Sequence, residues 1–126
     1  MELWIIAALG VFLVNIYLPA AMFLPQEGLL NHAGPRDNLP EPAPMAARAR
    51  RALANMQENL PIFLALAFLA MILPDARMGQ AILGAQLFVY ARAAYIPCYL
   101  SGIPWLRSAA YTIGAAGCVV MLLAVL

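Results

Sequence analysis

Four stretches of this sequence are long and apolar enough to cross a lipid bilayer as helices. A bilayer core about 30 Å thick takes roughly 20 helical residues, and residues 3–24 supply about that many. Further spans are predicted at residues 45–73, 79–99 and 105–126. The chain is 65% hydrophobic and 10% charged, whereas a soluble domain usually has about 25% charged residues. We therefore predict an all-α integral membrane protein in which residues 1–126 form one domain.

The second predicted span depends on the polar residues near its start. Its purely apolar part, residues 60–73, has only about 14 residues, which is short for a span. Five alanines soon after Met45 favour a longer helix that begins there. That helix then brings several charged and amide side chains into or near the membrane. The first helix is expected to end at residue 24, because Pro25 disfavours helix at the residue before it.

Short connections at residues 74–77 and 100–104 make neighbouring helices antiparallel, which predicts an up-down four-helix bundle. Six of the seven arginines lie on the side of the first and third connections, and only Arg77 lies on the other. Cytoplasmic loops carry the arginine excess, so the polar end is predicted to face the cytoplasm and both termini the opposite side. The absence of lysine favours a GC-rich bacterial genome and hence a bacterial inner membrane. A net charge of +1 gives no indication of nucleic-acid binding.

Two of the predicted helices carry a stripe of polar side chains at the same end of the bundle. Spacings of three or four residues place the members of each stripe on one helical face. The stripe on the second helix consists of Arg48, Arg51, Asn55 and Glu58. The stripe on the third helix consists of Arg92, Tyr95 and Tyr99. Arg107 lies at the same end of the fourth helix.

Charged side chains within a span cost about 2.5–3.5 kcal/mol each at mid-bilayer on insertion scales, so they face the protein interior and often mark a site. Arginines bind carboxylates, and the lone carboxylate of Glu58 suits an ammonium group. The stripes therefore suit a small anionic ligand with an amino group, such as a zwitterionic peptide or a lipid head group. The alternative is that Arg51 pairs with Glu58 only to join helices, while Arg107 reaches out to lipid head groups.

Two runs of sequence resemble a known membrane family. The first run, from Arg51 to Leu64, reads RALANMQENLPIFL. It resembles the hallmark of the MAPEG family, the membrane-associated proteins in eicosanoid and glutathione metabolism. The second run, RAAYIPCY from Arg92 to Tyr99, resembles the third-helix signature of that family, and Arg107 with Tyr111 resembles the start of its fourth helix. The shorter bacterial branch is the most similar, including residues 34–40 of the first connection.

The resemblance implies a homotrimer of four-helix subunits that holds glutathione, a co-substrate, in a cytoplasm-facing cleft between subunits. It implies a catalytic Arg107 that stabilises the glutathione thiolate, since a neighbouring arginine lowers the pKa of a thiol from about 8.5. The thiolate would attack a lipophilic electrophile arriving from the membrane lipids. The residues expected to bind glutathione are Arg51, Asn55, Glu58, Arg92, Tyr95 and Tyr99.

Departures from the family pattern leave other functions open. Synthases of the family carry a tyrosine directly after the motif glutamate and an arginine near the end of the first helix. This chain has Asn59 at the first position, and Gln26 with Glu27 at the second. The family also contains a non-catalytic lipid-binding member, so lipid binding or scaffolding is the alternative. A small multidrug exporter is less favoured, because such exporters carry a glutamate in the first span and residues 3–24 contain no acid.

Four other features of the sequence have structural interpretations. His32 is a lone histidine in a polar connection, and no metal site is predicted. Cys98 and Cys118 lie in apolar runs and are interpreted as buried thiols. Trp105, near a span end, is typical of an interfacial anchor. Two pairs of small residues suit close helix packing, namely Ala81 with Ala85 and Ala110 with Gly114.

Overall fold

The computed structural model describes residues 1–28, 33–34 and 40–126. Its helices are α1 (Glu2–Glu27), α3 (Pro44–Ile72), α4 (Met78–Ser101) and α5 (Pro104–Val125). All four are long and apolar enough to cross a membrane, which confirms the predicted all-α membrane fold. His32 and most of the connection that resembles the family, residues 35–39, lie outside the described residues.

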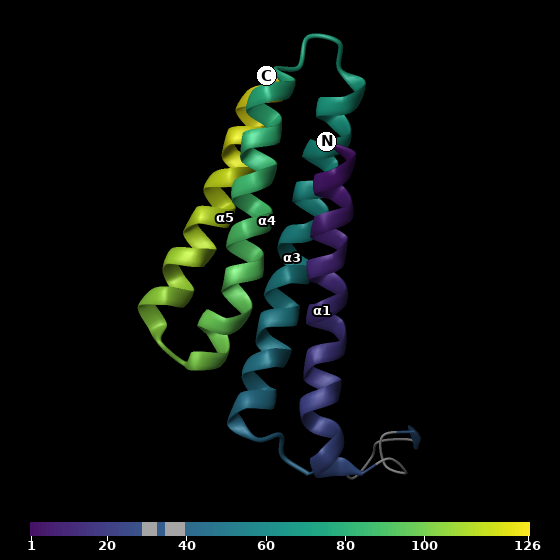
Figure 1. Ribbon diagram of the computed structural model, residues 1–126, viewed down its shortest axis with the longest axis vertical. Helices are drawn as coiled ribbons and strands as arrows, with labels where there is room; N and C mark the ends of the chain where they lie inside the picture. Colours follow the sequence, from purple (N-terminus) through teal and green to yellow (C-terminus); the bar gives the residue numbers. More distant parts are fainter. Residues whose placement is uncertain (29–32, 35–39) are drawn as a thin grey trace.

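The four helices run alternately up and down, as predicted (Figure 1). Both termini and the α3–α4 turn lie at one end of the bundle, and the α4–α5 turn lies toward the other. α1 packs mainly against α3, α4 packs most closely against α5, and α3 contacts both α4 and α5. The start of α3 and the end of α1 extend beyond the α4–α5 turn in this view. The start of the polar stripe of α3, at Arg48 and Arg51, therefore lies level with the end of α4 and that turn.

α1 continues past its predicted end at residue 24, through Pro25 to Glu27. A proline removes only one backbone donor, and in the last turn few helical bonds follow it. The amide of Gly28 donates to the carbonyl of Leu24 over 2.9 Å, which closes the final turn. The other boundaries differ from the predictions by one or two residues, which is within the usual uncertainty of helix ends.

Small residues allow α4 and α5 to approach very closely. A Cβ atom added to Gly84 would lie 2.6 Å from the backbone oxygen of Gly117. The small residues predicted to pack are all buried, namely Ala81, Ala85, Ala110 and Gly114. Because lipid offers helices no hydrophobic gain on association, such close backbone contact contributes much of the packing energy. Between α3 and α4, the rings of Phe63 and Phe88 stack with their centroids 4.5 Å apart.

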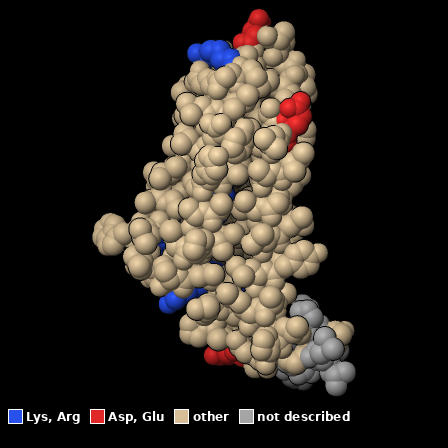
Figure 2. Space-filling model, in the orientation of Figure 1, with Lys and Arg blue, Asp and Glu red and all other residues tan. Residues whose placement is uncertain are grey.

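The surface is largely apolar, as expected for a chain surrounded by lipid. On the face shown in Figure 2, most of the exposed charge lies toward the two ends of the molecule. Large apolar side chains such as Leu3 and Ile72 are 70% and 75% exposed. Trp105, at the start of α5, is 84% exposed near the polar end. This position is typical of tryptophans at the boundary between lipid and water.

Candidate functional site

Hydrogen bonds join the polar stripe of α3 to α4. Arg51 Nε donates to the hydroxyl of Tyr99 over 3.2 Å, and Arg92 Nη1 donates to Asn55 Oδ1 over 2.6 Å. Residues spaced three or four apart on each helix lie on one face. The two stripes therefore meet along the line where α3 and α4 pack. Each of these contacts joins residues far apart in the sequence.

Arg92 is the largest fully buried side chain described, with only 2% of its surface exposed. One nitrogen bonds Asn55, while Nε and Nη2 have no hydrogen-bond partner among the described residues. The rings of Phe88, Tyr95 and Tyr111 lie 5.2–5.7 Å from the guanidinium carbon. Contacts at this range attract a cation through the ring quadrupole. They partly offset the high cost of a charge inside the membrane.

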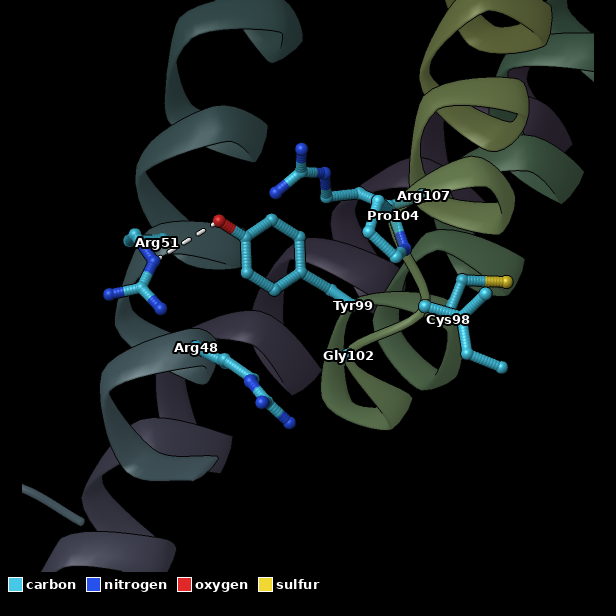
Figure 3. A pocket seen from close by; sticks show the side chains of 8 residues that line it. Arg48, Arg51, Cys98, Tyr99, Gly102, Pro104 and Arg107 are labelled. Carbon is cyan, nitrogen blue, oxygen red and sulfur yellow. Dashed lines mark hydrogen bonds between the residues drawn. The ribbon is translucent and has the colours of Figure 1, made fainter. Parts of the chain in front are cut away.

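Tyr99 stands between two guanidinium groups (Figure 3). The guanidinium carbon of Arg107 lies 5.3 Å from the ring centroid of Tyr99, on the α5 side. Arg51 reaches the hydroxyl of the same ring from α3. The ring of Tyr95 packs against that of Tyr99 with centroids 5.3 Å apart. Helices α3, α4 and α5 thus each contribute to one cluster of cationic and phenolic side chains.

A cavity of about 90 Å³ opens in this cluster. Its lining residues are Arg48, Arg51, Cys98, Tyr99, Gly102, Ile103, Pro104 and Arg107. The lining contains three guanidinium groups and no carboxylate, so it suits an anion such as a carboxylate. The volume exceeds the roughly 10–15 Å³ that one water needs by this measure. It is nevertheless small, and a single chain therefore encloses only part of a peptide-sized ligand.

A second, wider hollow adjoins the cavity on the α5 side, with a volume of about 240 Å³. Its lining residues are Tyr95, Arg107, Ser108, Tyr111 and Thr112. Arg107 therefore borders both spaces. The sequence interpretation did not include Ser108 or Thr112 in the candidate site. Ser108 precedes Tyr111 by three residues and Thr112 by four, and that spacing on one helical face could have indicated them.

Glu58 has a different environment from the rest of its stripe. It is exposed, and no ion pair joins it to Arg51 among the described residues, where the one pair found joins the N-terminus to Glu2. The alternative interpretation, in which Arg51 and Glu58 pair to join helices, is therefore wrong for the single chain. The physical reason is the register of α3, which directs Arg51 to Tyr99 and leaves Glu58 on an open surface. Glu58 is also the middle residue of α3.

Asn59 and Gln26, which depart from the family pattern, both make hydrogen bonds to the backbone. Asn59 Nδ2 donates to the backbone oxygen of Asn55, one turn earlier, over 2.7 Å. Gln26 Oε1 accepts from the amide of Ala43 over 2.9 Å. Gln26 thereby joins the end of α1 to the start of α3. Neither side chain replaces the phenol or guanidinium that the family synthases carry at these positions.

The described residues contain no group of three or more histidine, cysteine or acidic side chains that could hold a metal ion. Cys98 and Cys118 are free and half-buried thiols. Cys98 borders the three-arginine cavity (Figure 3), whereas Cys118 lies one helical turn beyond Gly114 on α5.

A family model described as MAPEG family matches residues 1–126, the whole chain. The chain belongs to the MAPEG family. No curated protein matches it closely enough to add a more specific relationship. MAPEG membership agrees with the four membrane helices, and it supports a membrane function of the glutathione-related transferase or peroxidase type in general. In this MAPEG protein, the arginines, asparagine and tyrosines of the two runs that resemble the family, together with Arg107, meet where α3, α4 and α5 converge.

Proposed function

We propose that this MAPEG protein is a membrane-bound glutathione-dependent transferase or peroxidase that acts on lipophilic electrophiles. The observation that carries the proposal is the position of Arg107, which borders both the three-arginine cavity and the wider hollow. Glutathione offers carboxylates and an amino group for the polar residues and a thiol for Arg107. The thiol proton would pass to solvent, and the thiolate sulfur would bond to an electrophilic carbon of a substrate held in the wider hollow while a leaving group, such as a halide, departs with its bonding electron pair. With a hydroperoxide, the sulfur would bond to the outer oxygen, the O–O bond would break to release an alcohol, and a second glutathione would convert the sulfenic acid to the disulfide and water. Arg107 is thus the catalytic residue of the proposal.

The remaining site residues would hold the peptide. Arg51 and Tyr99 are already joined by a hydrogen bond, which fixes both for binding a carboxylate. Arg92 would act through Asn55, since it is fully buried and bonds that amide. Tyr95 packs against Tyr99 and supports its ring. The carboxylate of Glu58 would take the ammonium group of the ligand.

The proposed active unit is a homotrimer, with the ligand held between neighbouring copies. Two observations support this. Glu58 is exposed at the middle of α3, and a charge facing lipid at that depth costs about 2.5–3.5 kcal/mol on insertion scales. The cavity of about 90 Å³ is also too small to enclose a tripeptide. A neighbouring copy would cover Glu58 and complete the site.

The proposed orientation places the site at the cytoplasmic face of a bacterial inner membrane. Among the described arginines, only Arg77 lies at the end that carries the termini. Because arginine-rich ends stay in the cytoplasm, Leu126 is expected to lie outside it. Of the reporters fused after Leu126, only one that functions outside the cytoplasm should therefore be active. Alkaline phosphatase and green fluorescent protein fusions measure the two locations. Fluorescence without phosphatase activity would reverse the orientation.

Calorimetry tests the proposal directly. The protein is purified in mild detergent, its oligomeric mass is measured by light scattering, and glutathione is titrated into it. We expect a trimer that binds glutathione, and S-methylglutathione should bind too while giving no thiolate absorbance. A monomer that releases no heat with either peptide would contradict the proposal. Heat with S-methylglutathione but no thiolate with glutathione at neutral pH would indicate binding without catalysis.

A non-catalytic lipid-binding or scaffolding role is the second candidate. The presence of Asn59 and Gln26 favours it, because neither residue supplies the phenol or guanidinium that the family synthases carry at these positions, and both side chains are engaged in hydrogen bonds to the backbone. Both functions would use the three-arginine cavity, with a lipid head group replacing the peptide in the second. A multidrug exporter has no such support, since the MAPEG match covers the whole chain.

A further inference from the structure

The α4–α5 turn, residues 101–104, carries the chain from Tyr99 to Arg107. The turn is exposed, and so are the first residues of α5. Its internal bonds are local, such as that from the hydroxyl of Ser101 to the carbonyl of Cys98 over 2.7 Å. Local bonds shape the turn but cannot fix its distance from α3. That distance depends on contacts made across to α3.

Arg48 makes such a contact. Its Nη1 donates over 3.0 Å to the carbonyl of Leu100, near the end of α4. The last carbonyls of a helix have no partner within the helix and carry a partial negative charge. A guanidinium therefore satisfies this carbonyl and is attracted to the helix end. Arg48 thus joins α3 to the residue immediately before the turn.

Gly102 provides the space that this contact requires. Its φ of 77° lies in the left-handed region that glycine adopts readily. A Cβ atom added there would lie 2.7–2.9 Å from the guanidinium atoms of Arg48. The guanidinium thus lies flat against the backbone of the turn. Any other residue at this position would push Arg48 away from Leu100.

We propose that Arg48 is a positioning residue that holds the α4–α5 turn against α3 and so sets where Arg107 stands relative to the ligand held by Arg51. Arg48 acts here through the carbonyl of Leu100. The kinetic consequence rests on the proposed function, whereas the structural consequence does not. Arg107 follows the turn directly, so movement of the turn away from α3 would displace its charge. Such misplacement lowers turnover strongly even when the ligand still binds.

The native thiol of Cys98 reports the position of the turn, because it borders the same cavity. In Arg48→Met, we expect Cys98 to react with N-ethylmaleimide about tenfold faster. Loss of a hydrogen bond from a charged donor raises the population of the locally opened state by about that factor. Gly102→Ala should produce the same increase while retaining the arginine. Arg48→Lys should restore slow labelling in part, since it keeps a donor for Leu100. Mass spectrometry of peptides separates labelling of Cys98 from labelling of Cys118. The labelling rate of Cys118 should be the same in all variants.

Arg50→Met is the matched control. Arg50 carries the same charge two residues later, but its guanidinium carbon lies over the ring of Phe23 on α1, 4.4 Å from the ring centroid. Its loss should leave Cys98 labelling at the wild-type rate. Combining Arg48→Met with Gly102→Ala should add little to either variant alone, because both remove one contact. Unchanged labelling in Arg48→Met, or an equal increase in Arg50→Met, would overturn the proposal.

Kinetics separate positioning from direct ligand binding. We expect Arg48→Met and Gly102→Ala to lower kcat by about tenfold or more, with the KM for glutathione nearly unchanged. A raised KM with unchanged kcat in Arg48→Met would instead make Arg48 a ligand-binding residue and overturn the positioning role. If wild type shows no conjugation while Cys98 labelling responds as expected, the positioning of the turn stands and the proposed enzymatic function fails.

Discussion

Replacing Arg107 with alanine is expected to leave glutathione binding nearly intact and to abolish the thiolate. The charge of Arg107 matters most once the thiol has ionised, so its loss should lower kcat and leave KM little changed. Removing one group that stabilises a developing anion typically lowers turnover by about 10²–10³. The measurements are the ultraviolet absorbance of the thiolate at neutral pH and the rate of conjugation of a generic aryl halide.

The comparison variant for this experiment is Arg51→Ala. Arg51 lies on α3 and bonds the Tyr99 hydroxyl, so its loss should weaken the ground state and the transition state together and raise KM. Arg50→Ala controls for the loss of charge, because that side chain lies over Phe23 and away from the cavity. Full turnover in Arg107→Ala would refute the role of Arg107 even if glutathione binds. Normal glutathione binding in Arg51→Ala would refute the division of roles between α3 and α5.

Gly84→Ala is expected to destabilise the bundle more than any other single methyl addition considered. The new Cβ would lie 2.6 Å from the backbone oxygen of Gly117 and 2.9 Å from the backbone nitrogen of Met121. Backbone atoms cannot move aside as side chains can, so α4 and α5 must separate. Overpacking of this kind costs about 1–3 kcal/mol. The expected result is a clearly lower melting temperature, followed by circular dichroism in detergent.

Gly10→Ala is the matched control, since nothing lies within 4 Å of a Cβ at that position on α1. Replacing a glycine within a helix by alanine favours the helix by about 0.5–1 kcal/mol. The control should therefore melt at the wild-type temperature or slightly above it. Equal melting temperatures for the two variants would contradict a close backbone contact between α4 and α5 at Gly84.

The four spans, and the end of the bundle at which the polar residues gather, could be predicted from the sequence. Hydrophobic length is a local property, and roughly 20 apolar residues suffice to identify each span. The stripe on α3 could be predicted for the same reason, because a spacing of three or four residues fixes a helical face before any packing occurs. Family membership rested on the same residues, and the match over residues 1–126 confirms it. The roles of the individual site residues stay predictions.

Which polar groups contact one another was decided only by the tertiary structure. Spacing allowed Arg51 to pair with Glu58, but the packing of α3 on α4 brings Arg51 to Tyr99 and leaves Glu58 open. Likewise, the contact between Arg48 and Leu100 joins residues 52 positions apart. Such contacts depend on the rotation and depth of each helix relative to its neighbours. Those are set by how the ridges and small residues of whole helices fit together, which no local spacing encodes.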